Sequence, residues 1–99
     1  MRVLIAPSAA RDIDAIHEYI SQDSPRSALA VSQQLEQACV ALGDWPQSYP
    51  VVGRFDGAEV RRRPVGAYAV LYAILSDRVE IVRILHAARD MDALLGDPS

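Results

Sequence analysis

Three strand-like runs follow one another between residues 58 and 86 of this 99-residue chain, and they constrain its fold more than any other feature. The runs are Ala58–Val65, Tyr68–Leu75 and Val79–His86. The connections between them, at 66–67 and 76–78, have the length of hairpin turns, which predicts an antiparallel meander. The middle run is apolar on both of its alternating faces, a pattern that predicts a central strand covered on both sides.

The residues before the meander predict one further strand and two helices. Arg2–Ala6 is a short apolar run that we expect to join the sheet. A first helix is predicted over Ala9–Ser21 with Ser8 as its N-cap, and a second from Pro25 to Leu42. Two helices joined by so short a turn should form an antiparallel hairpin whose apolar side packs on the sheet.

The predicted element order is therefore β-α-α-β-β-β, an α+β fold with a helical hairpin packed on a small, mostly antiparallel sheet. The length allows one core, so residues 1–99 are expected to form a single domain. Segment 44–58 is rich in proline and glycine and is predicted to be a long loop anchored by Trp45, Tyr49 and Phe55. Residues 87–95 are predicted to add a last helical turn or two.

Several side chains are expected to be structural. Tyr68 and Tyr72 share one face of the central strand and should lie in the core, as should Cys39 beside the apolar seam of the second helix. Asp12 is expected to favour the start of the first helix. The face of the second helix opposite its apolar seam is expected to carry five polar residues: Ser27, Ser32, Gln33, Gln34 and Gln37.

Positive charge is concentrated in the second half of the chain. The net charge is −3, yet residues 54–89 hold seven arginines against four acids. All ten basic residues are arginine, which binds carboxylates and phosphates through a planar fork of donors and almost never releases its proton. The composition therefore favours anion binding and leaves no lysine for general-base chemistry.

Other features narrow the class of protein. No apolar run approaches the roughly 20 residues of a membrane helix, and we expect no secretory leader because no charged-then-apolar run of that kind is seen. The single cysteine, Cys39, has no partner for an internal disulfide and no companion for a zinc site. We therefore expect a cytoplasmic protein that uses no membrane, metal or cofactor.

Six segments, taken in order, resemble one known family. They are Ala10-x-Asp12-x-x-x-Ile16-x-x-Tyr19-Ile20, Pro25-x-x-Ala28, Leu42-x-x-x-Pro46, Val60-Arg61-Arg62, Gly66-x-Tyr68-x-Val70-x-Tyr72 and Ile84-Leu85-His86-Ala87-Ala88-Arg89-Asp90. The ordered set, which runs from Ile5 to Asp90, is similar to the RelE/ParE toxins of bacterial type II toxin–antitoxin modules. The last segment most resembles the ParE branch.

The resemblance implies a toxin that is neutralised by a cognate, ParD-like antitoxin in a hetero-oligomer, with DNA bound only through that complex. Two activities exist in the family. ParE-type members inhibit DNA gyrase, whereas RelE-type members are endoribonucleases that cut mRNA on the ribosome. A third hypothesis, from a different functional class, is that the chain is a non-toxic protein-interaction module with an exposed strand edge.

The residue types bear on the choice between these activities. Cleavage of RNA needs groups that transfer protons and a cation that stabilises the phosphorane. RelE-type enzymes supply lysines and a tyrosine near the C-terminus, or histidines and an acid, whereas here the available set is His86 with Arg61 and Arg83. Gyrase inhibition needs only a complementary surface. We therefore favour a gyrase inhibitor over an enzyme, with the endoribonuclease as the alternative.

The candidate residues for binding the target or the antitoxin are Arg61, Arg62, Arg63, Arg83, His86 and Arg89. Alternation along a strand sends Arg61 and Arg63 to one face of the sheet and Arg62 to the other. His86 and Arg89 have a structural interpretation as well, in which His86 donates to a nearby carbonyl at the end of the last strand, and Arg89 with Asp90 fixes the chain end by local hydrogen bonds.

Overall fold

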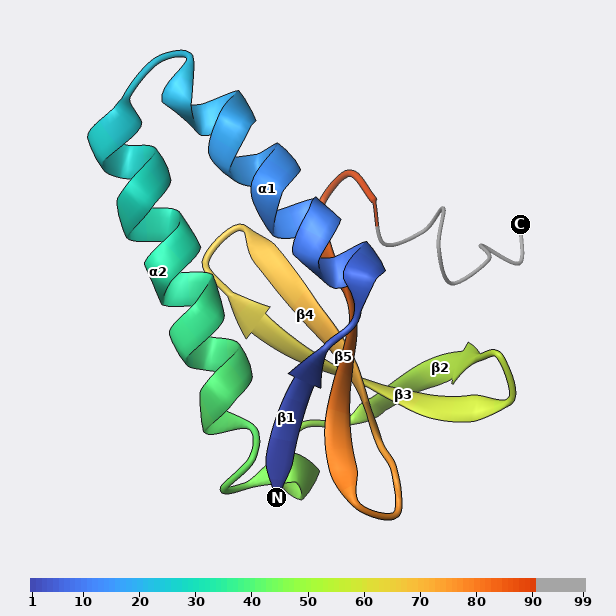
Figure 1. Cartoon of the computed structure of the whole chain (residues 1–99). Helices are drawn as coiled ribbons and strands as arrows, with labels where there is room; N and C mark the ends of the chain where they lie inside the picture. Colours follow the sequence, from blue (N-terminus) through green and yellow to red (C-terminus); the bar gives the residue numbers. More distant parts are fainter. Residues whose placement is uncertain (91–99) are drawn as a thin grey trace.

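The computed structural model describes residues 1–90 and confirms the predicted α+β class. Its elements, in order, are β1 (Arg2–Ile5), α1 (Pro7–Ser21), α2 (Pro25–Ala41), the 3-10 helix η1 (Pro46–Ser48), β2 (Val51–Phe55), β3 (Ala58–Val65), β4 (Tyr68–Ile74) and β5 (Arg78–His86) (Figure 1). No helix of these ninety residues is long and apolar enough to cross a membrane.

The five strands form one mixed sheet in the order β1-β5-β4-β3-β2. β1 runs parallel to β5, with Val3 opposite Val79, and every other pair is antiparallel. β4 occupies the centre of the sheet, as predicted from its two apolar faces. All five residues from 69 to 73 are buried, because the helices cover one face and side chains of the neighbouring strands close over the other.

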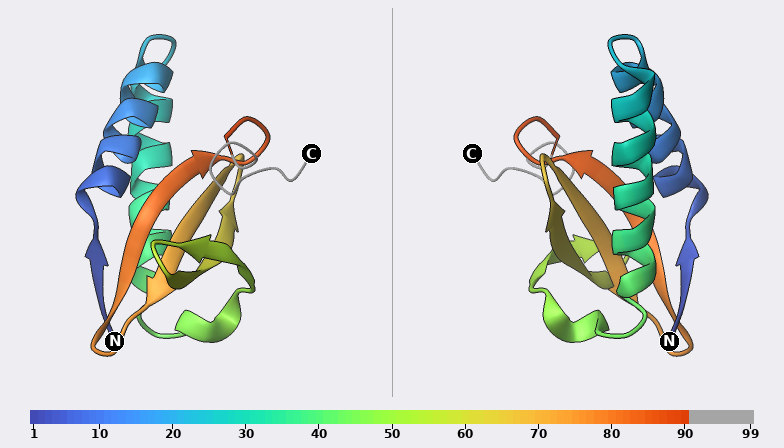
Figure 2. Two further views of the ribbon diagram at one scale, coloured as in Figure 1. Left: turned by 90° about the vertical axis from the view of Figure 1, so that its right-hand side faces the viewer. Right: turned by 90° about the vertical axis from the view of Figure 1, so that its left-hand side faces the viewer.

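The two helices form the predicted antiparallel hairpin and lie together on one face of the sheet (Figure 2). The main core fills the space between them and strands β4 and β5. Its buried members are Ala9, Ile13, Leu35, Cys39, Leu42, Val70, Tyr72, Val79, Ile81 and Ile84. The predictions for Cys39 and Tyr72 are thus confirmed, and Tyr68 packs against the same core while half-buried.

The face of the sheet turned away from the helices, here called the second sheet face, has a smaller core. Val60, Leu71 and Leu85 are buried there, with Val52 and Val82 packed against them. None of the helices in the described part of the chain covers this face, and the β2–β3 hairpin extends beyond the body of the molecule at its side (Figures 1 and 2).

Segment 44–58 is more ordered than the predicted loop. It contains η1 and the edge strand β2, whose pairing with β3 is shifted by a bulge between Val51 and Gly53. The hairpin turns at Asp56 and Gly57, with φ values of 55° and 83°. Both residues lie in the left-handed region that a two-residue hairpin turn of this kind requires.

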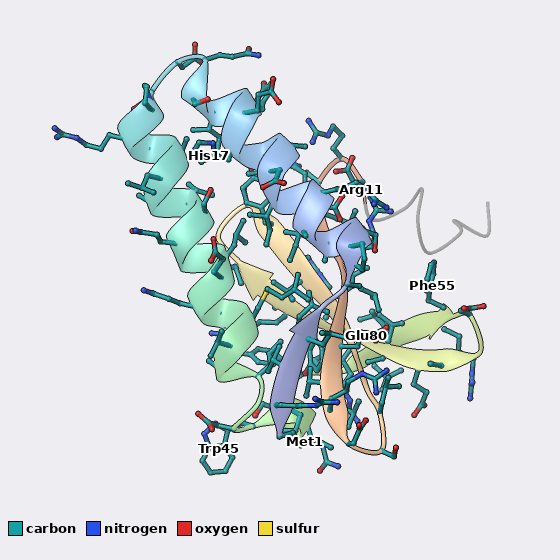
Figure 3. All side chains as sticks on the ribbon, viewed as in Figure 1. Met1, Arg11, His17, Trp45, Phe55 and Glu80 are labelled. Carbon is teal, nitrogen blue, oxygen red and sulfur yellow. The ribbon has the colours of Figure 1, made fainter. Side chains whose placement is uncertain are left out.

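Trp45 and Phe55 do not anchor this segment. Both side chains point into solvent (Figure 3), with Trp45 74% exposed. Tyr49 does serve as an anchor, because it packs against the main core and its carbonyl accepts from Arg61 Nη1 at 2.6 Å. Tyr72 also donates its hydroxyl to the carbonyl of Pro46 at 2.7 Å, so buried groups of the sheet hold the segment.

The helix starts differ in one detail from the prediction. α1 begins at Pro7, with Ala6 as its N-cap, because proline is favoured at the first helical position. Ser8 is therefore inside the helix and is not its cap.

In α2, Ser32 is buried and not on the outward face, because it lies within about 60° of Ala28, Leu35 and Cys39 around the helix axis.

The predicted final helix over residues 87–95 lies partly outside the described residues. Within the described part, residues 87–90 form hydrogen-bonded turns. The amide of Ala87 donates to the carbonyl of Ala67, and the amides of Arg89 and Asp90 both donate to the carbonyl of His86.

Candidate binding site at the end of strand β5

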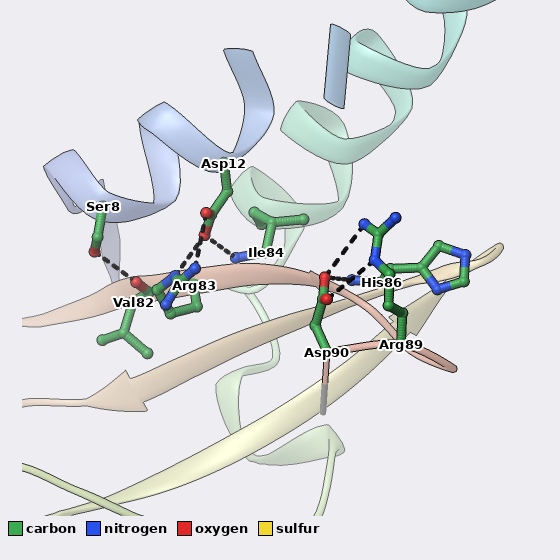
Figure 4. Close-up of polar contacts among 8 residues, drawn as sticks. All are labelled: Ser8, Asp12, Val82, Arg83, Ile84, His86, Arg89 and Asp90. Atoms are coloured by element: carbon green, nitrogen blue, oxygen red, sulfur yellow. Dashed lines mark hydrogen bonds and ion pairs between the residues drawn. The ribbon is translucent and has the colours of Figure 1, made fainter. Parts of the chain in front are cut away.

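The outer edge of β5 is sealed by side chains where β1 ends. β1 pairs with β5 only as far as Ile5 and Ile81. Beyond that point Ser8 Oγ donates to the carbonyl of Val82 at 2.8 Å, and the amide of Ile84 donates to Asp12 Oδ2 at 2.9 Å (Figure 4). The first turns of α1 thus satisfy backbone groups that would otherwise be free at a strand edge.

Asp12 also holds Arg83 in a two-pronged ion pair. Arg83 Nε lies 2.7 Å from Asp12 Oδ2, and Nη2 lies 3.0 Å from Oδ1 (Figure 4). The hydrogen bond to Asp12 raises the pKa of Arg83. Asp12 lies well inside α1, so its role is to fasten the helix to β5 rather than to favour the helix start. The site residue Arg83 is thereby fixed in position.

A tight turn closes the end of β5. The amide of His86 donates to Asp90 Oδ2 at 3.1 Å, and Arg89 Nε lies 3.1 Å from Asp90 Oδ1. The Arg89 guanidinium and the His86 amide together lower the pKa of Asp90. The local hydrogen bonds expected of Arg89 and Asp90 are present, and Arg89 keeps a side chain that is 66% exposed.

His86 lies between two adjoining cavities of about 410 and 380 Å³. Both are lined by Ala15 and Ile16 of α1 and by His86 and Arg89. The imidazole meets the ring of Tyr68 edge-on, with the ring centres 5.6 Å apart. Its Nδ1 is buried and makes no hydrogen bond within residues 1–90. The cleft therefore combines an apolar wall on α1 with a cationic rim at Arg89.

Arg61 and Arg63 lie on the helical side of β3 and make structural contacts. Arg61 donates to the carbonyl of Tyr49, as described above, and Arg63 Nη1 donates to the carbonyl of Ala38 at 2.9 Å. The Arg63 guanidinium also lies 5.3 Å from the centre of the Tyr49 ring. Because Ala38 is in the last turn of α2, this arginine satisfies a helix end where cations are favoured.

Arg62 faces the opposite way, toward the second sheet face, since it pairs across β3 and β4 with Leu71 of that face. Its Nε is buried without a hydrogen-bond partner in the described part of the chain. The predicted alternation of the three arginines therefore holds, and Arg62 alone of the three faces the sheet surface that the two helices of residues 1–90 leave uncovered.

Only two of the three residues that would form a nuclease site are brought together, because Arg83 and His86 line the same cavity and Arg61 lies elsewhere on the sheet. Arg61 is aligned through Tyr72 with Ile81 of β5, and His86 lies five residues farther along that strand. Strand geometry then puts their backbones roughly 19 Å apart. Arg83 is held at the α1 edge of β5 by Asp12. No group of three or more metal-ligating side chains is found within residues 1–90 either.

Comparison with known proteins agrees with the fold. Residues 3–91 match the family described as ParE toxin of type II toxin-antitoxin system, parDE. Toxin RelE2 of Caulobacter vibrioides is 37% identical over 82 residues, which cover 82% of this chain and 89% of that protein. The chain therefore belongs to the ParE family and is a type II toxin of the ParE/RelE superfamily.

Two solved structures share the architecture. A chromosomal ParDE toxin–antitoxin system from P. aeruginosa superposes with a TM-score of 0.72 at 22% identity, covering 87% of this chain and 95% of that one. The toxin–antitoxin complex RelBE2 from Mycobacterium tuberculosis gives a TM-score of 0.55 at 26% identity, covering 86% and 95%. The arrangement of two helices on a mixed sheet is thus common to both branches.

Proposed function

We propose that this toxin inhibits DNA gyrase and is neutralised by a cognate antitoxin, with its action in the cytoplasm. The observation that carries the proposal is that both cations of the predicted nuclease set make structural contacts. Arg61 donates to the carbonyl of Tyr49 and lies roughly 19 Å from His86 along the sheet. Arg83 lines the same cavity as His86 but is held in an ion pair by Asp12. A toxin that works through surface complementarity needs no such constellation.

We assign binding of the target and the antitoxin to two surfaces, the cleft beside His86 and the second sheet face. Arg89 presents its guanidinium at the rim of the cleft, beside the exposed ring of Tyr19. Arg62 lies on the second sheet face. Of the six predicted site residues, we assign target and antitoxin contacts to these two arginines. Arg61, Arg63 and Arg83 position the segments around them.

An antitoxin suited to the second sheet face would combine acidic and apolar side chains. The face has a buried apolar centre with Phe55, 45% exposed, toward the β2–β3 hairpin and Leu4, 48% exposed, on β1. A carboxylate would give Arg62 the partner that it lacks within the described residues. The two toxin–antitoxin complexes among the structural neighbours support an antitoxin partner for this chain.

A supercoiling assay with antitoxin-free toxin tests the target. We expect loss of gyrase supercoiling together with linear, cleaved plasmid. Arg89→Ala should weaken inhibition. Arg2→Ala serves as the matched control, because Arg2 is an exposed arginine of β1 that lies beside the start of β5 and pairs with Asp77. Folded toxin that stops growth and leaves gyrase fully active would contradict the proposal.

The endoribonuclease is the second candidate. His86, whose Nδ1 has no hydrogen-bond partner within residues 1–90, lines the cleft with Arg83, and the 37%-identical relative is named Toxin RelE2. Ribosome-dependent mRNA cleavage that disappears in His86→Ala would establish it. Under the gyrase proposal, neither wild type nor His86→Ala cleaves mRNA, and the variant still inhibits supercoiling, provided that it folds.

A further inference from the structure

The solvent-facing side of α2 is almost free of charge. Its exposed residues from 27 to 41 are Ser27, Leu29, Ala30, Gln33, Gln34, Glu36, Gln37, Val40 and Ala41. Glu36 is the one charged residue among them. Leu29 and Val40 are 54% and 65% exposed, and Trp45 follows just beyond the helix. An exposed helix face with depleted charge and large apolar side chains has the composition of a protein interface.

The adjacent helix shows that this composition is specific to α2. The exposed side of α1 carries Arg11, Asp14, His17 and Glu18, as is usual for a helix face in water. Both helices lie on the same side of the sheet (Figure 2). α2 forms the flank of the molecule that lies away from the turn of the β2–β3 hairpin (Figure 1), so a partner on α2 leaves the second sheet face open.

Four of the exposed residues form a straight line along α2. At about 100° per residue, Leu29, Gln33, Glu36 and Val40 fall within roughly 60° of one another around the axis. Their spacing of four, three and four residues is that of a seam along which two helices pack.

The line is complementary to an antiparallel copy of itself. A two-fold axis placed midway between Gln34 and Leu35 puts Leu29 against Val40 of the second copy and Gln33 against Glu36 of the second copy. Both pairs occur twice. The amide of Gln33 is a donor for the Glu36 carboxylate. The same operation brings exposed Arg26, at the start of α2, toward exposed Asp44 and Trp45 just past its end.

We propose that α2 is a self-association surface, and that its partner is a second copy of this chain packed antiparallel along Leu29, Gln33, Glu36 and Val40. A lone charged partner would find only Glu36 to pair with, whereas a second copy satisfies every member of the line. One helix face buries less than the 1,200–2,000 Å² or so of a standard stable interface. Association is therefore weak and rises with protein concentration.

Sedimentation of antitoxin-free toxin over a wide concentration range tests this surface. Wild type shifts reversibly from monomer to dimer. Gln33→Glu places two carboxylates together twice across the axis and weakens dimerisation about tenfold. The double variant Gln33→Glu/Glu36→Lys restores it to within about threefold of wild type, because opposite charges then face each other. Restoration by the second charge is specific to the antiparallel register.

Gln34→Glu is the matched control. Gln34 is an exposed glutamine one residue after Gln33, about 130° from the centre of the line, so its variant dimerises as wild type does. Circular dichroism establishes that each variant is folded. Wild-type toxin that stays monomeric throughout, or Gln33→Glu that dimerises normally, overturns the proposal. Monomeric wild type whose antitoxin affinity falls in Gln33→Glu also overturns it, and assigns α2 to the antitoxin instead.

Discussion

Asp12 of α1 grips Arg83 of β5 through both carboxylate oxygens, at 2.7 and 3.0 Å, while one of the same oxygens accepts the amide of Ile84. The pair joins residues 71 positions apart in sequence. Asp12 occupies the edge of β5 at residues 83–84, just as β1 occupies that edge at residues 78–81. The contact also fixes α1 against the strand.

Removing this carboxylate should loosen the helix from the sheet. Asp12→Asn keeps the shape of the side chain but loses the charge-assisted bonds, so we expect the free energy of unfolding to fall by about 2 kcal/mol. That corresponds to a drop of roughly 8–16 °C in Tm for a domain of this size. Asp14→Asn, an exposed acid on the same helix, is the control. Equal Tm values for the two variants would contradict the assigned role of Asp12.

Two neighbouring arginines of β3 should have different roles, one in the stability of the fold and the other in antitoxin binding. Arg63→Ala removes the hydrogen bond to Ala38 and the contact with Tyr49, and should lower the unfolding free energy by about 1–2 kcal/mol. Arg62→Ala should change it by less than about 0.5 kcal/mol and weaken antitoxin binding about tenfold. Urea unfolding and titration calorimetry measure the two quantities. Weakened antitoxin binding in Arg63→Ala, with unchanged binding in Arg62→Ala, would place the antitoxin on the helical side of β3.

Acid should weaken the turn that ends β5. The pKa of Asp90 is lowered in the folded state, so the carboxylate contributes stability above its unfolded pKa near 3.9. That contribution is lost as pH falls through the lower, folded pKa. Wild type should therefore lose more stability than Asp90→Asn between about pH 5 and pH 2. Parallel pH profiles of urea midpoints for the two proteins would show that the turn is not linked to folding.

The thiol of Cys39 should report unfolding. It is fully buried, and this burial raises its pKa to about 11. The folded protein should therefore resist alkylation near pH 8 and react once urea unfolds it. A raised pKa in the folded state also means that the stabilising effect is present below the unfolded pKa and declines as pH rises from about 9 toward 11. Rapid labelling of native protein at pH 8 would contradict the burial of this side chain.

The fold was predictable where a pattern was local. Tyr68–Leu75 is apolar on both faces, and the sheet order confirms it as the central strand. β2 was missed because its run is short and includes a glycine and a bulge. The Asp56-Gly57 pair that turns its hairpin was a signal that could have identified it.

The site was less predictable, because its contacts join distant parts of the chain. Alternation correctly separated Arg62 from Arg61 and Arg63. The partners of these arginines, such as the carbonyls of Tyr49 and Ala38, are backbone groups that carry no mark in the sequence. The sequence also does not identify Asp12 as the partner of Arg83, because that pair depends on how α1 packs on β5.

The parallel pairing of β1 with β5 has a consequence for synthesis. Residues 2–5 have no place in the sheet until residues 78–81 are available, so the sheet is completed only when nearly all of the described chain has been made. A messenger that ends before the codon for Arg78 encodes a product that lacks β5, so β1 has no strand to pair with. We therefore expect toxicity only from chains translated through β5, and shorter products should be inert to the cell that makes them.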